Sequence, residues 1–429
     1  MKTILYPGKK MWELLCKRPV FEQGELTQTV QNILHRIKKY GDKALVEYSL
    51  EFDQVVLKSF KVPDKEMVQS VFQVSKELKG AINTAKQNIE KFHKAQFSSE
   101  EIIETTKGVK CWRKNVCIEK VGLYIPGGSA PLFSTILMLG IPAGIAGCRE
   151  IILCTPCDRE KKINPAILYT AQLVGIHKIY KIGGAQAIAA MAYGTESVER
   201  VNKIFGPGNQ YVTKAKELVQ QFGIAIDMPA GPSEVLIIAD ETCNPQFVAA
   251  DLLAQAEHGV DSQVVLLTTN NEIAKKVKSE MERQLNKLAR KQIASSALEN
   301  SFAVIMNNID ECIEFSNMYA PEHLILFVRQ SKKMTGKIIN AGSVFIGNYS
   351  CESAGDYASG TNHTLPTNGY ARSYSGVSLD SFMKKITFQE ISIEGIKNLG
   401  PTIEIMAEAE NLTAHKNAVT IRLKTLDND

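Results

Sequence analysis

The stretch Val121-Gly-Leu-Tyr-Ile-Pro-Gly-Gly-Ser-Ala-Pro131 decides the fold class, because it joins a strand-like run to a turn of small residues. Its first five residues are uncharged and rich in β-formers, and the glycines and prolines that follow interrupt the run. The chain then continues without a charged residue to Cys148. Because Gly and Pro recur throughout this region, we expect a buried strand, loop and helix rather than a membrane span.

Further β-rich runs follow and alternate with helical patterns, which predicts parallel sheets covered by helices. The predicted strands are Val121–Ile125, Ile151–Cys154, Lys178–Ile182, Glu234–Ala239, Gln263–Thr268, Phe302–Met306, His323–Val328 and Ser343–Ile346. Small-residue turns directly follow the first and third of these runs, at Pro126–Pro131 and Gly183–Gln186. Ligands of open α/β sheets bind at the carboxyl ends of strands, where such turns lie.

We therefore predict an α/β fold with two Rossmann-like domains, one inserted in the other, together with N-terminal helices and a helical C-terminal tail. Asp64–Lys94 has apolar residues at helical spacing and is predicted to be helical. The predicted limits are 1–20 for an N-terminal helical segment, 21–120 plus 230–374 for the first domain, 121–229 for the second and 375–429 for the tail.

Composition excludes several classes of protein. Among the 429 residues, Lys and Arg exceed Asp and Glu by only four, and no basic block interleaves with aromatic residues, so we expect no nucleic-acid partner. Nine scattered cysteines are typical of a reducing cytosol. The apolar run within Met1–Pro7 is too short for a signal peptide, so we expect a cytoplasmic protein without a membrane partner.

The histidines give the first indication of chemistry. Four of the seven lie beside or near a carboxylate or an amide in the second half of the chain: His258, His323, His363 and His415. Imidazole and carboxylate together bind zinc-like metals and transfer protons near neutral pH. The other three lie beside a lysine or an arginine and are expected at the surface: His35, His93 and His177.

One of these histidines ends a well-marked helix. Asn244 is its predicted cap, Pro245 occupies its first turn and Gly259 is expected to stop it. Asp251, Gln255 and His258 are spaced four and three apart, so a helix would place them on one face. This face offers ligands to a metal, with Glu257 as a further candidate. The segment alone favours a solvated polar stripe.

Two other segments carry polar groups of interest. Glu322 and His323 precede an apolar strand, and we expect both in the turn before it, where they could share acid–base work or form an exposed pair without a role. Ser350–Pro366 is nearly all small and polar and is predicted to be a functional loop, with Asp356 and His363 as its candidates. Glu410 and His415 are five apart, so they share no helix face.

Two familiar motifs are incomplete. Cys154-Thr-Pro-Cys157 has redox or zinc-knuckle spacing, but no second cysteine pair or nearby histidine completes a site, which favours two structural thiols. No Gly-x-Gly-x-x-Gly fingerprint occurs, so a dinucleotide would bind without that phosphate loop.

Taken together, the segments resemble the histidinol dehydrogenases, the bifunctional enzymes that close histidine biosynthesis. The match covers most of the chain. Its motifs are Val121–Ser134, Ile182-Gly-Gly-Ala-Gln-Ala187, Phe205-Gly-Pro-Gly-Asn209, Ile226-Asp-Met-Pro-Ala-Gly-Pro-Ser-Glu234, Asp251-Leu-Leu-Ala-Gln-Ala-Glu-His258, Ala320-Pro-Glu-His323, Gly355-Asp-Tyr-Ala-Ser-Gly-Thr-Asn-His363 and Ala407-Glu-Ala-Glu-Asn-Leu-Thr-Ala-His415.

This resemblance implies specific roles. One zinc ion per subunit would be bound by Gln255, His258, Asp356 and His415, in the first domain. Glu322 and His323 would be the catalytic pair, and the second domain would hold NAD through Tyr124, Gln186 and Asn209. The implied substrate-contacting residues are Ser233, Gln255, His258, His323, Asp356, Glu410 and His415, with His363 as a further candidate.

The implied activity is oxidation of L-histidinol to L-histidine through L-histidinaldehyde, with NAD consumed twice. The resemblance also implies a homodimer with a shared active site, in which the tail of one chain reaches the other. The nearest alternative is a related zinc and NAD alcohol dehydrogenase that acts on another amino or sulfonated alcohol. A zinc hydrolase would leave the NAD-type turns unexplained, and a two-lobed periplasmic binding protein would need a secretion signal.

Overall fold

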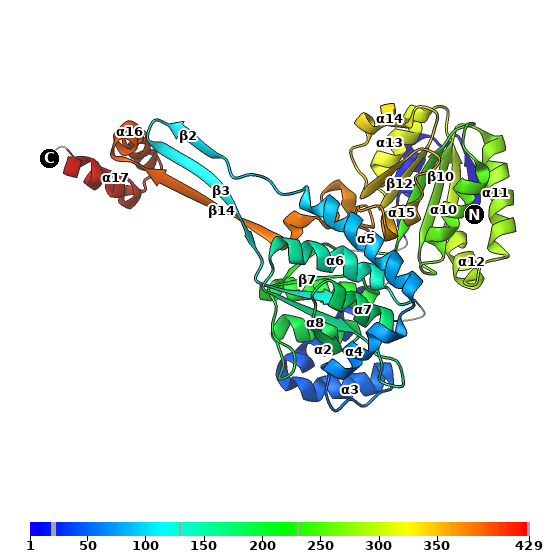
Figure 1. Cartoon of the computed structure of the whole chain (residues 1–429). Helices are drawn as coiled ribbons and strands as arrows, with labels where there is room; N and C mark the ends of the chain where they lie inside the picture. The colour runs from blue at the N-terminus through cyan, green and yellow to red at the C-terminus, as the bar shows by residue number, and fades with distance from the viewer. Residues whose placement is uncertain (19–22, 128–129, 230, 427–429) are drawn as a thin grey trace.

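The computed structural model describes residues 1–18, 23–127, 130–229 and 231–426, and its strands form three sheets (Figure 1). Two of the sheets are wholly parallel. The larger has the order β1 (Lys2–Leu5), β11 (Phe302–Ile305), β10 (Gln263–Thr268), β9 (Glu234–Ala239), β12 (His323–Phe327) and β13 (Ser343–Ile346). The smaller has the order β6 (Lys178–Lys181), β5 (Glu150–Thr155), β4 (Lys120–Tyr124), β7 (Lys203–Phe205) and β8 (Ala225–Ile226).

Helices cover both faces of the six-stranded sheet, so its central strands are buried on both sides and read as continuous apolar runs. One face packs against Trp12 of α1 (Lys9–Leu15) and Phe315 of α13 (Ile309–Tyr319). The other face packs against α10 (Pro245–Ala256), α11 (Asn271–Leu285) and α12 (Lys291–Glu299). Short helices α14 (Ser331–Met334) and α15 (Glu352–Tyr357) complete this lobe.

The five-stranded sheet forms the second lobe, again between two layers of helices (Figure 1). The helices that belong to it are α2 (Gln23–Tyr40), α3 (Asp42–Asp53), α4 (Asp64–Gln73), α6 (Phe133–Ala146), α7 (Pro165–Leu173), α8 (Gly184–Tyr193) and α9 (Gln210–Val219). Helix α5 (Lys76–Lys94) packs on α6 and extends toward the six-stranded lobe.

An extended arm projects from the two lobes. Its antiparallel sheet has the order β14 (Met383–Ile391), β3 (Val109–Cys117) and β2 (Ile102–Thr106), and α16 (Ile393–Ala409) and α17 (Thr413–Leu426) lie at its far end (Figure 1). The tail predicted to be helical therefore begins with a strand that pairs along its whole length with β3. Eight of the nine residues of β14 are exposed in this chain, so no buried apolar pattern marked it as a strand.

Most of the other predictions about single elements are confirmed. All eight predicted strands are present, and the parallel sheets are confirmed. Asp64–Lys94 is helical as predicted and forms two helices, because Ser75 caps α5 through the N–H of Leu78. The expectation that His93 lies at the surface is wrong. His93 is buried rather than exposed, and Ile82, Ala85 and Ile89 share its helix face. No helix among the described residues is long and apolar enough to cross a membrane.

The nested arrangement of two domains and the predicted domain limits stay predictions. The two parallel sheets are formed by residues 120–226 and by residues 2–5 with 234–346. The chain therefore leaves the six-stranded sheet after its first strand, forms the second lobe, and returns to complete the sheet.

A close backbone approach between β4 and β7 gives a test of the packing. Gly206 has φ +126°, and a Cβ at this position would overlap the carbonyl oxygen of Tyr124. We expect Gly206→Ala to lower the free energy of unfolding by roughly 2 kcal/mol or more, because the strained backbone and the overlap act together. Gly144, in an exposed turn of α6, has open space where a Cβ would lie, so Gly144→Ala should raise it by about 0.5–1 kcal/mol. Thermal melting followed by circular dichroism measures both, and equal shifts would contradict the steric explanation.

Candidate active site

Helix α10 brings the first candidate ligands into position. Asn244 caps it by accepting a hydrogen bond from the N–H of Gln246, as predicted, but the helix ends at Ala256 and not at Gly259. His258 therefore lies in the turn beyond the helix, where its N–H donates to the carbonyl of Gln255 at 3.2 Å. A shared helix face therefore does not relate His258 to Gln255, although both side chains approach Glu352. Gln255 is buried, whereas His258 is exposed.

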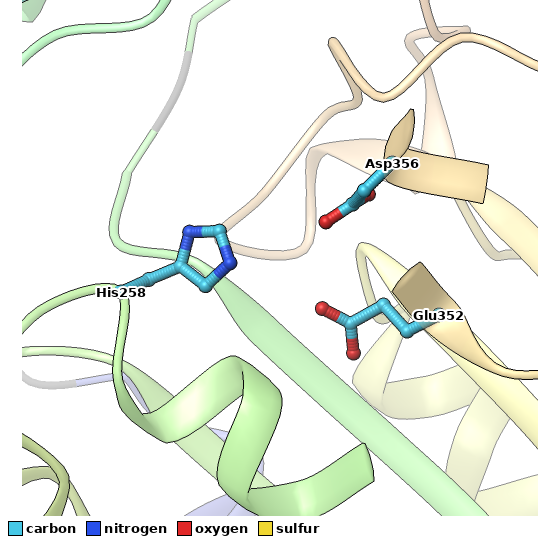
Figure 2. Close-up of side chains that lie close together, drawn as sticks. All are labelled: His258, Glu352 and Asp356. Atoms are coloured by element: carbon cyan, nitrogen blue, oxygen red, sulfur yellow. The ribbon is translucent and has the colours of Figure 1, made fainter. Parts of the chain in front are cut away.

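The segment predicted as a loop contains helix α15, and this helix contributes two carboxylates. Glu352 and Asp356 are four residues apart and lie on the same face, pointing toward His258 (Figure 2). One ligand atom from each of the three residues lies within 4.8 Å of the others. Glu352 was missed from the sequence, although its spacing from Asp356 would have found it had the segment been taken as a helix.

Gln255 lies between this cluster and β9. In one orientation of its amide, Nε2 donates to the carboxylate of Glu352 and the oxygen accepts from the N–H of Glu234 at 3.1 Å. In the other orientation, the amide oxygen would face the carboxylate oxygens of Glu352 and neither hydrogen bond would form, so the first orientation is the one that satisfies both groups. Gln255 thus lies in hydrogen-bond contact with Glu352, one member of this cluster.

The predicted acid–base pair lies on the other side of the carboxylates. His323 is the first residue of β12 and not part of the turn before it, while Glu322 lies just outside the strand. His323 Nδ1 is 3.7 Å from Glu322 Oε2, and His323 Nε2 is 3.5 Å from Asp356 Oδ1. Both side chains are buried, and the buried Nδ1 of His323 has no hydrogen-bond partner among the described residues. A substrate or water molecule would supply the missing partner.

Acidic side chains outnumber basic ones in this site. Burial raises the pKa of Glu322 to about 8, and burial also raises that of Glu352 well above its usual range. Burial alone would lower the pKa of His323, but the carboxylates of Glu352, Glu322 and Asp356 together raise it to about 10. The buried carboxyl groups of Glu322 and Glu352 and the partly buried Asp356 thus surround one imidazole, and burial favours the protonated form of both glutamates. A divalent cation with oxygen and nitrogen ligands, such as zinc, fits this set of donors.

His363 connects the site to the second lobe. Its Nδ1 donates to the backbone carbonyl of Asp356 at 2.9 Å, because a carbonyl can only accept. Its Nε2 lies 3.2 Å from the hydroxyl of Thr135 in α6. The neighbouring Asn362 donates to the carbonyl of Met138, also in α6, at 2.6 Å and lies 3.4 Å from the buried Nε2 of His93. The loop after α15 is therefore fixed against the second lobe.

A cavity of about 1280 Å³ lies in the second lobe, and the three predicted cofactor-binding residues, Tyr124, Gln186 and Asn209, line it. The hydroxyl of Tyr124 accepts from the N–H of Gly184, and Asn209 caps α9 by accepting from the N–H groups of Tyr211 and Val212. The cavity opens at the carboxyl ends of β4 and β6, as the turns predicted. Its volume admits an elongated ligand such as a dinucleotide.

The remaining candidates differ in position. Ser233 directly precedes Glu234 at the edge of the site. Glu410 and His415 are exposed at the far end of the arm, remote from α15 in the same chain (Figure 1). All nine cysteines are free, and burial raises the pKa of both Cys154 and Cys157, which keeps their thiols protonated.

Comparison with known proteins identifies the family. The sequence pattern of the histidinol dehydrogenases matches residues 16–423. The histidinol dehydrogenase of Bacteroides thetaiotaomicron is 59% identical over 99% of this chain and 100% of its own length. The chain belongs to the histidinol dehydrogenase family. The histidinol dehydrogenase of Vibrio parahaemolyticus is 51% identical over 99% of this chain and 99% of its own length. The crystal structure of the histidinol dehydrogenase from Elizabethkingia anophelis is 59% identical and superposes with a TM-score of 0.98. The match covers 100% of this chain and 99% of that chain.

Membership in the histidinol dehydrogenase family makes the chain an oxidoreductase of histidine biosynthesis. The structure offers candidate groups for such chemistry: the buried neighbours Glu322 and His323, a cluster of three side chains able to hold a metal ion, and a large cavity in the second lobe.

The cluster in Figure 2 generates a prediction about metal affinity. We expect Glu352→Gln to weaken zinc binding about 10- to 100-fold, because Glu352 lies beside the candidate ligands His258 and Asp356 and its carboxylate would support a cation bound there. Glu257→Gln, one residue before His258, is the matched control and should leave the affinity unchanged. Metal content after dialysis, measured by inductively coupled plasma mass spectrometry, decides between the two carboxylates. If only Glu257→Gln lost zinc, Glu257 rather than Glu352 would be the carboxylate that supports metal binding.

Proposed function

We propose that the chain catalyses the zinc- and NAD-dependent four-electron oxidation of L-histidinol to L-histidine, through L-histidinaldehyde, in the cytoplasm. The observation that carries the proposal is the buried pair Glu322 and His323 beside the cluster of His258, Glu352 and Asp356. Identity of 59% over the full length of a histidinol dehydrogenase supports the same substrate.

Zinc would be held by Gln255, His258 and Asp356 together with His415 of the partner subunit. A bound zinc ion would orient the substrate nitrogens and neutralise the buried carboxylates. The exposure of His258 supports this assignment, because a ligand from outside the chain can reach its side of the cluster. With Glu352 and Asp356 neutralised, much of the charge that raises the pKa of His323 is removed, and its imidazole can serve as a base.

Residues Tyr124, Gln186 and Asn209 would hold NAD in the cavity of the second lobe, and bound NAD would supply the hydride acceptor for both oxidations. His363, fixed through Thr135 to the lobe that contains this cavity, would help to align substrate and cofactor. Ser233, and Glu410 and His415 from the partner's tail, would complete the substrate contacts.

His323 would take the proton of the substrate alcohol in the first oxidation and of the aldehyde hydrate in the second. Glu322 would take a proton from the water that attacks the aldehyde. Its buried carboxylate suits this step, since a pKa of about 8 makes it a stronger base than an exposed glutamate. Exclusion of bulk water from both side chains would keep the aldehyde from side reactions.

The arm supports a homodimer with a shared active site. Large apolar side chains are exposed along its strands and helices: Ile102, Ile103, Ile386, Phe388, Ile405 and Met406. An isolated chain with such a surface would aggregate, so a second copy would cover it. The same copy would bring Glu410 and His415 to the site.

The first test is the stoichiometry of the reaction. We expect two NADH per L-histidinol consumed, followed by absorbance, with activity lost on chelation and restored by zinc. One NADH would indicate an ordinary alcohol dehydrogenase. No NADH from L-histidinol, with NADH from another amino or sulfonated alcohol, would contradict the proposed substrate.

Variants of the acid–base pair separate the two half-reactions. Glu322→Gln should slow oxidation of L-histidinaldehyde by about 100-fold or more and spare the first oxidation, because only the second needs activated water. His323→Asn should slow both, with zinc content unchanged. Stopped-flow absorbance starting from the alcohol or the aldehyde measures each step. If Glu322→Gln slowed both oxidations by the same factor, Glu322 would not be the group that activates water.

Mixed dimers test the shared site. Inactive His258→Ala and His415→Ala subunits, unfolded and refolded together, should regain about a quarter of the wild-type sites, because half of the dimers are mixed and each has one intact site. If both residues acted within one chain, mixing would restore nothing. His35→Ala is the control partner, since His35 is an exposed residue of α2, outside the site.

A further inference from the structure

A buried ion pair lies behind the active site, between the N-terminal segment and the central strand β9. Arg18 Nε is 2.8 Å from Glu234 Oε2, and Arg18 Nη2 is 3.0 Å from Glu234 Oε1, so the guanidinium binds both carboxylate oxygens. The side chains are only 8% and 2% exposed. A fully buried charge pair is costly unless every hydrogen bond is made, which requires a defined geometry.

Tyr319, at the end of α13, completes this geometry. Its hydroxyl is 3.1 Å from Glu234 Oε2 and 2.7 Å from Gln263 Oε1, and its ring centroid lies 3.5 Å from the guanidinium carbon of Arg18. Arg18 also donates to the carbonyl oxygen of Tyr319 at 2.8 Å. We call Arg18, Glu234, Gln263 and Tyr319 the Arg18 cluster. It joins the N-terminal segment, β9, β10 and α13 at one point.

The Arg18 cluster contacts the active site through the backbone N–H of Glu234. The N–H of Glu234 donates to Glu322 Oε2 at 2.9 Å, and it also lies 3.1 Å from the amide of Gln255. Holding the side chain of Glu234 therefore fixes a donor that orients the carboxylate of Glu322.

We propose that Arg18 and Tyr319 are positioning residues for Glu322, acting through Glu234, and that the N-terminal segment thereby supports the hydration half of the reaction. This rests on the role proposed for Glu322. If the ion pair only stabilised the fold, its loss would lower the rates of both oxidations by the same factor. If it positions Glu322, its loss should slow the aldehyde oxidation, which uses Glu322, more than the alcohol oxidation.

Tyr319→Phe is the sharpest variant, because it removes the hydroxyl and keeps the ring beneath Arg18. We expect about a tenfold slower oxidation of L-histidinaldehyde and at most a small change in the first oxidation of L-histidinol. In a Glu322→Gln background, Tyr319→Phe should cause no further loss, because the group it orients is already gone. Arg18→Lys should retain more aldehyde oxidation than Arg18→Met.

The control is Trp12→Phe, which changes another buried residue of the N-terminal segment that packs on α13 without touching Glu234. It should leave the ratio of the two oxidation rates unchanged. An equal loss from Tyr319→Phe in both backgrounds, or an equal loss in both oxidations, would overturn the positioning role. Failure of the proposed function itself looks different: the wild-type protein would then form no NADH from L-histidinol.

Discussion

The electrostatics of the candidate active site are dominated by three carboxyl groups that surround one imidazole. Glu322, Glu352 and Asp356 surround His323 in a site that excludes water, and no lysine or arginine among the described residues forms an ion pair with them. Such an arrangement is unfavourable in an isolated chain, because each buried charge loses its hydration. A cation bound as proposed above would offset this cost. The site would then trade stability of the empty protein for metal binding.

The two lobes present their sites at opposite ends of their strands. The cavity lies where β4 and β6 end, which is the usual place in an open parallel sheet. His323 and Glu234, by contrast, are the first residues of β12 and β9, so the candidate metal site lies at the amino ends of the larger sheet. Helix α6 and the loop after α15 bring these two ends together through Thr135 and His363. The candidate metal site and the second lobe are thus joined by a direct side-chain contact.

The sequence predicted the buried strands well, because strands covered on both faces are almost continuously apolar. It failed where the relevant partner was not a neighbour in the chain. Strand β14 has little buried surface in this chain, so its pairing with β3 left no apolar pattern. His93 was predicted to be exposed because a lysine follows it, although its spacing from Ile89 and Ala85 places it on the buried face of α5. Glu352 was overlooked because the small residues around it are more typical of a loop than of a helix.

The role of His415 could come only from the resemblance to a family, and the structure explains why. No spacing within the tail relates His415 to His258, and the arm holds the two apart within one chain. If the partner's arm supplies the missing ligand, the free energy of metal binding is also free energy of dimerisation. The exposed apolar surface of the arm and the unbalanced carboxylates of the site would then be two parts of one incomplete structure. Each would be satisfied by the same second chain, so assembly and catalytic competence would arise in a single step.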